Sequence, residues 1–351
     1  MHIEIFILIL AFIFAVLFFW AFKRLPREEW QFICSFPAHK TEDGRWRGWN
    51  LTYYGLFTAL ALICALLALL LMMFSMRVPS AVSVFIIAAI LVFCLPASRL
   101  TARILEKKKY TLSVGGTFFI GILIAPWIIY AADILSKKYF AVNLSLLSVM
   151  TAMIVAYSIG EGLGRLACIS FGCCYGRKLE LCSSFTRKVF KNINFIFTGK
   201  LKKISYAHQW EGKEVIPVQA MTAVIYIFSG LIGMYLFFRG FVLLPLLLNL
   251  FITQLWRILS EFMRADYRGE GKISGYQIMA LLSIIYGLII IYLFKNTDKD
   301  VRPDLIIGLN TVCDPFIIIF MIALGSVVFI YTGKSKVTDS TINFKIIEKN
   351  I

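Results

Sequence analysis

Residues 164–177 read GRLACISFGCCYGR, a glycine- and cysteine-rich segment that contains Arg165 and Arg177. The segment directly follows a long apolar run, near residues 140–160. An ionisable side chain at membrane depth costs at least about 2–3 kcal/mol, so it marks a site with a partner. Because arginine keeps its positive charge, the expected partner of Arg165 is an anion.

The composition indicates a membrane protein. Of the 351 residues, 60% are hydrophobic and only 16% are charged, which is more apolar than the core of a soluble domain requires. The apolar runs lack the two-residue alternation of barrel strands, so we predict an all-α polytopic membrane protein. Runs of about 18 apolar residues or more predict nine spans. These spans lie near residues 3–22, 51–75, 79–96, 112–133, 140–160, 215–237, 241–262, 273–295 and 311–332. The first run is too long for a signal peptide and has no basic segment before it, so we expect it to be retained.

Positive charge alternates between the two sides of the predicted bundle. The net charge is +16, and 28 of the 36 Lys and Arg residues fall in connections on one side, against 7 in the alternate connections. The positive-inside rule would place the basic side in the cytoplasm. A second interpretation is that the basic face attracts anionic phospholipid head groups.

Several unusual residues converge on the basic side. Arg257 and Glu261 are four residues apart, so they lie one above the other on a helix. A helical ion pair is weaker when Arg precedes Glu, and burying the two charges costs desolvation free energy. We therefore favour a ligand-facing role for Arg257 and Glu261 over a purely structural ion pair. The planar fork of arginine binds two phosphodiester oxygens, and we predict that Arg165 and Arg257 clamp one lipid phosphate. The glycines Gly164, Gly172 and Gly176 would permit tight turns and close approach to the head group.

This pattern resembles the prolipoprotein diacylglyceryl transferase family over about residues 50–295, which contain seven of the nine spans, the number in that family. The matching elements, in chain order, are Tyr54-Gly55, Gly115-Gly116, Gly164-Arg165, Gly172 to Gly176, Pro217-Val218-Gln219, Arg257, Glu261-Phe262-Met263-Arg264 and Gly275-Tyr276-Gln277. From these elements and the shared membrane face we assign catalytic roles to Arg165, Arg257, Glu261 and Tyr54, with Glu261 orienting Arg257. We assign substrate-binding roles to Gly115, Gly116, Gly172, Gly176, Arg99, Gln219, Arg264 and Gln277.

The sequence departs from the family mainly at polar positions. Val114 and Ile216 stand where the family has histidines, and Cys168, Phe171 and Cys173 replace two asparagines and an acidic residue of its signature. Met221-Thr222 replaces a Tyr-Glu pair, and His2, His39 and His208 lie elsewhere in the chain. The phosphate-binding arginines are retained, whereas only Tyr54, Tyr110 or a basic environment would partly replace the lost histidines. We therefore expect weakened or altered transferase chemistry.

The resemblance implies transfer of a diacylglyceryl group from phosphatidylglycerol to the lipobox cysteine thiol of an exported preprolipoprotein, with release of glycerol phosphate. It implies no cofactor or metal. The family acts at the outer side of the bacterial cytoplasmic membrane. The positive-inside rule would instead place the basic side, which carries the motif residues, in the cytoplasm. We favour the family orientation, because the longest motif loop is too long for that rule. Two alternatives stay open: a paralogue that binds or moves anionic phospholipid, and a transferase with a different acceptor.

The resemblance also divides the chain. Residues 1–50 would form an extra membrane helix and a basic linker, 51–295 the transferase-like core, and 296–351 an extra helix and a tail. Within the core, residues 177–214 combine basic residues with aromatic ones, which predicts an interfacial arm on lipid head groups. No recognised nucleic-acid-binding motif accompanies this charge, so we expect no nucleic-acid partner.

Four of the eight cysteines lie close together in sequence: Cys168, Cys173, Cys174 and Cys182. Their C-x4-C-C-x7-C spacing is not a standard zinc pattern, and no histidine is near, so a metal site is the least favoured interpretation. A redox or acyl-accepting thiol activated by Arg165 and Arg177 is the second. Packing in a tight turn is the interpretation that the sequence favours.

Overall fold

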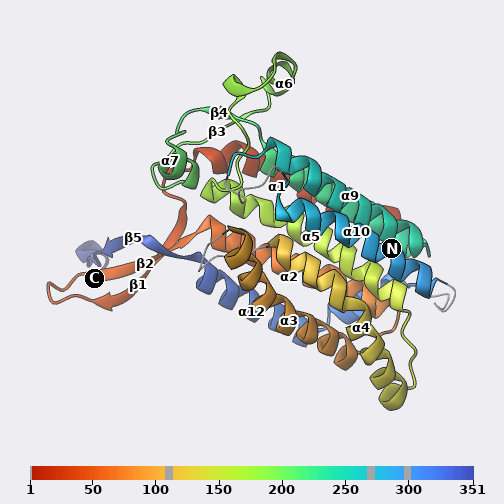
Figure 1. Ribbon diagram of the computed structural model, residues 1–351. Coiled ribbons are helices and arrows are strands. Elements are labelled where there is room, and N and C mark those ends of the chain that lie inside the picture. The colour runs from red at the N-terminus through yellow and green to blue at the C-terminus, as the bar shows by residue number, and fades with distance from the viewer. Residues whose placement is uncertain (1, 107–113, 267–272, 296–301) are drawn as a thin grey trace.

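The computed structural model describes residues 2–106, 114–266, 273–295 and 302–351. Within these ranges nine helices are long and apolar enough to cross a membrane, as predicted. They are α1 (Ile3–Arg24), α2 (Tyr53–Ser75), α3 (Ser80–Glu106), α4 (Val114–Phe140), α5 (Leu146–Phe171), α8 (Val218–Phe238), α9 (Leu243–Met263), α10 (Gly275–Phe294) and α12 (Pro315–Gly333). The helices run roughly side by side in one bundle (Figure 1), so the predicted fold class is confirmed.

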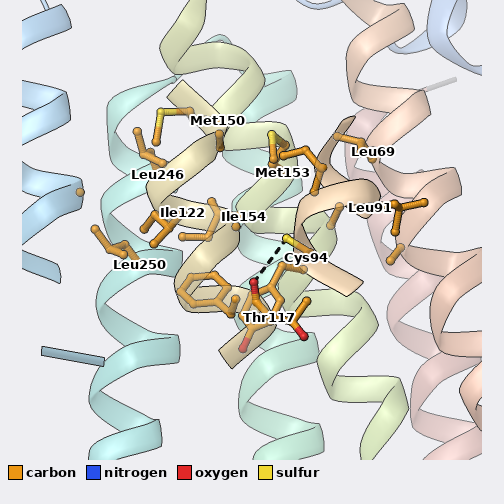
Figure 2. A pocket seen from close by; sticks show the side chains of 18 of the residues that line it. Leu69, Leu91, Cys94, Thr117, Ile122, Met150, Met153, Ile154, Leu246 and Leu250 are labelled. Atoms are coloured by element: carbon orange, nitrogen blue, oxygen red, sulfur yellow. Dashed lines mark hydrogen bonds between the residues drawn. The ribbon is translucent and has the colours of Figure 1, made fainter. Parts of the chain in front are cut away.

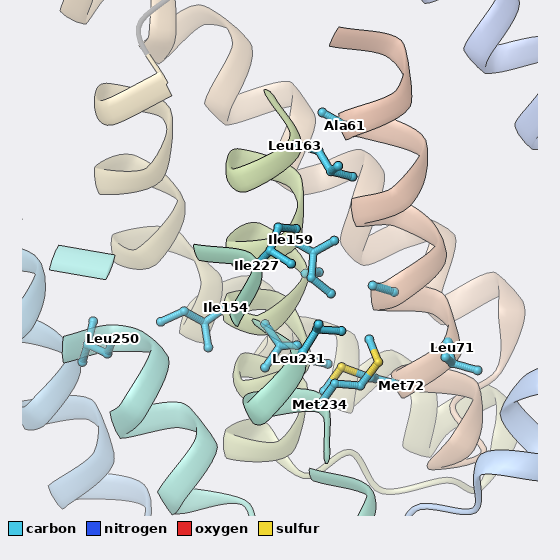
Figure 3. Close-up of a cluster of buried hydrophobic side chains, with 14 of the residues drawn as sticks. Ala61, Leu71, Met72, Ile154, Ile159, Leu163, Ile227, Leu231, Met234 and Leu250 are labelled. Carbon is cyan, nitrogen blue, oxygen red and sulfur yellow. The ribbon is translucent and has the colours of Figure 1, made fainter. Parts of the chain in front are cut away.

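Helix α5 is the centre of the bundle, packed against α2, α8 and α9. Figure 3 shows its apolar contacts, in which Ile159 of α5 lies beside Ile227 of α8 and Ile154 points toward Leu250 of α9. A polar contact adds to them: the Asn249 side-chain oxygen in α9 accepts hydrogen bonds from Ser158 of α5 and Ser229 of α8, both at 2.9 Å. Hydrogen bonds between membrane helices fix which faces meet.

The quoted segment begins as helix, which extends the span that we predicted to end near residue 160. Helix α5 continues through Arg165 to Phe171, and Gly172 at φ 66° ends it in the left-handed region that glycine tolerates. The apolar run stops near residue 160 because Glu161 and Arg165 are charged. The helix continues because these two side chains pair with each other inside the bundle.

The sequence did not predict the three-stranded antiparallel sheet of β1 (Phe32–Lys40), β2 (Trp46–Thr52) and β5 (Lys334–Ile342), in the order β1-β2-β5. It projects from one end of the bundle (Figure 1). The expected linker 23–50 is therefore largely a hairpin, completed by the C-terminal tail. The sheet joins the bundle where the start of α2 packs closely against the end of α12. A Cβ at Gly55 would lie 2.1 Å from the Gly333 Cα, so glycine lets the two helices approach here.

Short elements make up the arm between α5 and α8: a 3-10 turn (Leu179–Leu181), α6 (Ser184–Phe190), β3 (Phe195–Ile196), α7 (Lys203–His208) and β4 (Glu214–Val215). Phe185 and Tyr206 are exposed as the arm prediction requires, but Phe195 and Phe197 are buried against the body of the protein. The arm is attached there by Lys202, whose buried ammonium donates to the carbonyls of Leu25 at 3.0 Å and Ser170 at 2.8 Å. Burial lowers the pKa of Lys202 to about 8.

The remaining short elements lie near the chain termini. A 3-10 turn (Leu25–Arg27) follows α1, α11 (Leu305–Val312) packs against α2, and a last 3-10 turn (Glu348–Asn350) ends the chain.

Candidate functional site

Two buried arginines on different helices share one carboxylate. Arg165 of α5 forms an ion pair with Glu161 one turn earlier, and the Arg257 Nη2 of α9 lies 3.7 Å from the same Glu161 Oε1. Arg257 Nη2 also donates to the Tyr157 hydroxyl at 2.7 Å. The side chains of Arg165, Arg257 and Glu161 are 14%, 11% and 6% exposed, so water screens their charges weakly.

Glu261 has a different partner from the one we expected. It lies 3.8 Å from Arg264, and among the described residues its ion pair is with Arg264 rather than with Arg257. Arg264 in turn donates two hydrogen bonds to Asp266, at 2.8 and 2.9 Å. Burial raises the pKa of Asp266 to about 6, although Arg264 opposes this shift. Among the described residues, the carboxylate that pairs with Arg257 is therefore Glu161 rather than Glu261.

These ion pairs form two clusters of opposite formal charge. The first, which we call the arginine pair site, holds Arg165, Arg257 and Glu161 and carries one net positive charge. The second holds Arg264, Glu261 and Asp266 and carries one net negative charge, so Arg264 is fully compensated. In the arginine pair site, the Nε atoms of both arginines are buried and have no hydrogen-bond partner among the described residues. A buried site with a positive excess and unused donors suits a singly charged anion.

Figure 2 shows an apolar cavity of about 310 Å³ inside the bundle, and Tyr157 connects it to the arginine pair site. It is lined by side chains from α2, α3, α4, α5, α9 and α10, among them Leu69, Ile122, Met153 and Leu250. Tyr157 also lines it, and its hydroxyl is the group that accepts from Arg257. Tyr157 thus lies between the apolar cavity and the arginine pair site.

The two glycines at the start of α4 have separate functions. A Cβ at Gly115 would lie 2.5 Å from Arg257 Nη1, so only glycine leaves the guanidinium room beside this helix. A Cβ at Gly116 would lie 2.4 Å from the Thr101 side chain of α3, so this residue serves helix packing. Gly115 thus belongs to the arginine pair site and Gly116 supports it from outside.

Two predicted substrate-binding amides have intramolecular partners. Gln219 donates to the Cys173 carbonyl at 2.8 Å, while its side-chain oxygen is buried with no partner among the described residues. Gln277 forms a capping box with Ser274 and donates to the Ile258 carbonyl at 3.1 Å, which fixes α10 to α9. Both amides therefore position backbone near the site.

Arg99 is exposed on α3, and no ion pair joins it to the arginine pair site among the described residues. Gly176 pairs with Arg264 in an isolated antiparallel bridge, and a Cβ there would lie 2.4 Å from the Ile216 carbonyl oxygen. The described ranges do not include Tyr110.

Three of the four clustered cysteines meet in space. The sulfurs of Cys168, Cys173 and Cys174 lie within 4.8 Å of one another, whereas the Cys182 thiol contacts the Lys178 carbonyl at 3.2 Å. Tyr54 is close enough to interact electrostatically with all three thiols. Hydrogen bonding to Cys168 and Cys173, together with nearby Arg264 and Arg165, holds the pKa of Cys174 well below its usual value.

Sequence reasoning missed Glu161 and Tyr157, although a signal was present. Tyr157, Glu161 and Arg165 are spaced by four residues, so they line one face of α5. Glu four residues before Arg is also the favourable orientation for a helical ion pair. His208 likewise lies nearer to the cysteine cluster than we expected. Its Nδ1 forms a hydrogen bond with the Tyr175 hydroxyl, and Tyr175 directly follows Cys174.

One of two comparisons with known proteins finds a match for this chain. The family model described as prolipoprotein diacylglyceryl transferase matches residues 45–293, which is 249 of the 351 residues. The match includes all the site residues named above. A search of the curated proteins finds no significant match.

Proposed function

We propose that this chain, which belongs to the prolipoprotein diacylglyceryl transferase family, moves a diacylglyceryl group from phosphatidylglycerol to the lipobox cysteine thiol of an exported preprolipoprotein. The family supports transferase activity in a membrane; the donor, the acceptor and the residue roles are our proposal. The observation that carries it is the arginine pair site, in which Arg165 and Arg257 share Glu161 and keep unused Nε donors.

The charge of the arginine pair site matches the donor lipid. A phosphodiester carries one negative charge, which neutralises the single positive excess of Arg165, Arg257 and Glu161. When the glycerol C–O bond breaks, the phosphate leaves with the bonding electrons and gains a second negative charge. Two buried guanidinium groups stabilise that developing charge, which lowers the barrier to transfer. Glu161 holds both groups in place before the lipid arrives.

The cavity beside Tyr157 accommodates the other end of the donor. Its lining is apolar, and it reaches between six helices at the level of α5 residues Met150 to Tyr157. An acyl chain in this cavity would place the head group on the Arg257 side of Tyr157. The reaction also needs an acceptor thiolate, because the thiol form of cysteine is a poor nucleophile. Tyr54 lies beside the cysteine cluster and is our candidate for a group that contacts the acceptor.

We further propose that residues 51–295 are the catalytic core of this multi-pass membrane protein and that the outer helices α1 and α12 are additions to it. We propose that the site faces the outer side of a bacterial cytoplasmic membrane. Residues 177–214 would then lie at its outer surface, and the tail after Lys334 would be outside. A fluorescent reporter fused to the C-terminus tests the orientation, and fluorescence from the cytoplasm would overturn it.

A lipid-binding function without transfer is the second candidate. The substitutions Val114 and Ile216, at positions where the resemblance places histidines, favour it, because they remove groups able to accept a proton. Transfer to an acceptor other than a lipobox is a third outcome.

One assay separates the three candidates. The purified chain is incubated with labelled phosphatidylglycerol and a lipobox peptide, and the thioether product and glycerol phosphate are measured. We expect both products, and we expect Arg165→Ala to abolish them while Arg103→Ala, an exposed arginine on α3, leaves them unchanged. Lipid binding without either product supports the second candidate. Products that persist in Arg165→Ala would contradict the assigned site.

A further inference from the structure

The cysteine cluster is built by the turn that ends α5. Gly172 adopts φ 66° and Cys174 adopts φ 58°, so two left-handed residues reverse the chain within three positions. The Cys173 amide donates to the Cys168 carbonyl at 3.0 Å, which brings the residues after the turn back over the last helical turn. A left-handed conformation at a non-glycine residue is unfavourable and persists where the surroundings fix it.

Hydrogen bonds from a side chain of α8 and from the backbone after α9 hold this turn. Gln219 of α8 donates to the Cys173 carbonyl at 2.8 Å, and the Ala265 amide after α9 donates to the Tyr175 carbonyl at 3.1 Å. Gly176 pairs with Arg264 across the same junction. The positions of Cys168, Cys173 and Cys174 therefore follow from main-chain geometry, and their side chains are already gathered before any ligand binds.

The spacing of the sulfurs suits a metal ion better than a disulfide. Tetrahedral zinc with Zn–S bonds of about 2.3 Å requires sulfur atoms about 3.8 Å apart. The three sulfurs lie within 4.8 Å of one another, so small rotamer changes would bring them onto one ion. Thiolates are the ligands that thiophilic ions such as zinc prefer. The sequence argued against zinc from a non-standard spacing and the lack of a nearby histidine, whereas the structure brings three of the four cysteines together and places Cys182 elsewhere.

We propose that Cys168, Cys173 and Cys174 bind one thiophilic divalent metal ion, zinc in the ordinary case, as a three-thiolate site whose fourth position takes the acceptor thiol. This inference rests on the proposed function. Arg165 and Arg264 lie close enough to interact electrostatically with Cys174, so Arg165 interacts both with this cluster and with Glu161 of the arginine pair site. Acceptor and donor would thus meet on opposite sides of one arginine.

Metal binding would supply the deprotonation of the acceptor thiol, for which the expected histidines are missing. A thiol that coordinates a metal ion is bound as thiolate, and its proton passes to water. The acceptor sulfur then forms the S–C bond with the glyceryl carbon while the C–O bond breaks, and glycerol phosphate leaves with the bonding electrons. Activation of a nucleophile by metal coordination is an established alternative to a general base.

The test is a cobalt titration of the purified full-length chain in detergent, followed by sulfur-to-cobalt charge-transfer absorbance, with zinc content measured in parallel. We expect one ion per chain. Because changes outside the ligand shell already reduce metal affinity 10- to 100-fold, Cys173→Ser should reduce it at least about 100-fold, as should Cys168→Ser. Cys182→Ser is the matched control, from the same segment and equally half-buried, and should bind like wild type. A lipobox peptide should intensify the charge-transfer band, and the same peptide with serine in place of its cysteine should not.

The outcomes separate this inference from the proposed function. Absence of stoichiometric metal, or equal affinity in Cys173→Ser and wild type, overturns the metal site whatever the lipid assay shows. A peptide that leaves the cobalt spectrum unchanged overturns the open fourth position. Metal bound through the three cysteines in a chain that transfers nothing from phosphatidylglycerol would refute the transferase function and leave the metal site standing.

Discussion

Replacing Glu161 by Gln is expected to make the stability of this protein depend on anionic lipid. Glu161 is 6% exposed and lies 3.7 Å from Arg257, in addition to its ion pair with Arg165. At this distance and an effective dielectric constant of about 20, two unit charges interact by about 4 kcal/mol. Gln keeps the shape of the side chain but leaves two buried guanidinium groups without a counter-charge. A buried pair that loses one partner typically destabilises a protein by about 3–5 kcal/mol, so we expect about 3 kcal/mol.

The assay is thermal unfolding of the purified protein in phosphatidylcholine nanodiscs, with and without phosphatidylglycerol. The variant should unfold at a lower temperature in phosphatidylcholine alone, and phosphatidylglycerol should raise its midpoint more than that of wild type, because the phosphate replaces the missing negative charge. Glu261→Gln is the matched control: Glu261 is also about 7% exposed, but its partner Arg264 keeps Asp266. Equal stability of Glu161→Gln and wild type, or an equal lipid response in both glutamate variants, would refute the reasoning.

Three further predictions concern neighbouring features of the fold. Gly115→Ala should reduce transfer at least tenfold and also lower stability, since the new Cβ would displace the flexible end of Arg257 and overlap the ring of buried Tyr276; unchanged transfer kinetics would remove Gly115 from the site. Gly116→Ala should lower the free energy of unfolding by about 1–3 kcal/mol, because its Cβ would overlap Thr101 in a helix interface, and thermal unfolding measures this. Lys202 has a folded-state pKa of about 8, below its value of about 10.5 in an unfolded chain, so between these pH values the unfolded chain holds a proton that the folded chain has released. Wild-type stability should therefore rise by up to about 3 kcal/mol relative to Lys202→Met as the pH increases from 8 to 10.5, and parallel pH profiles of unfolding would contradict this.

The membrane helices were predictable because hydropathy is a local property. Each run of apolar residues specifies its own span, and in a bilayer a helix pairs the backbone N–H and C=O groups of that span with one another. The C-terminal end of α5 was not predictable in this way, because Glu161 and Arg165 interrupt the apolar run yet neutralise each other in the fold. The sheet was missed for another reason: β5 pairs with β2 across nearly 300 residues, and short polar strands carry no signal of such distant partners.

The candidate site was only partly predictable. The motif residues Arg165 and Arg257 do come together, as their arginine chemistry and order in the chain suggested. The carboxylate that joins them is Glu161 rather than Glu261, because the rotation of α9 against α5 is decided by packing that a sequence does not reveal. The same limit applies to the cysteines, where the left-handed Cys174 selects which thiols meet.

The central claim is that Arg165 and Arg257 hold one and the same phosphate. A double-mutant cycle on phosphatidylglycerol affinity tests it directly, with Arg165→Ala, Arg257→Ala and the double variant in phosphatidylcholine nanodiscs. If both arginines bind one phosphate, the double variant should lose less affinity than the sum of the single losses, with a coupling of at least about 1 kcal/mol. Strictly additive losses, or variants that bind phosphatidylglycerol as tightly as wild type, would contradict the account.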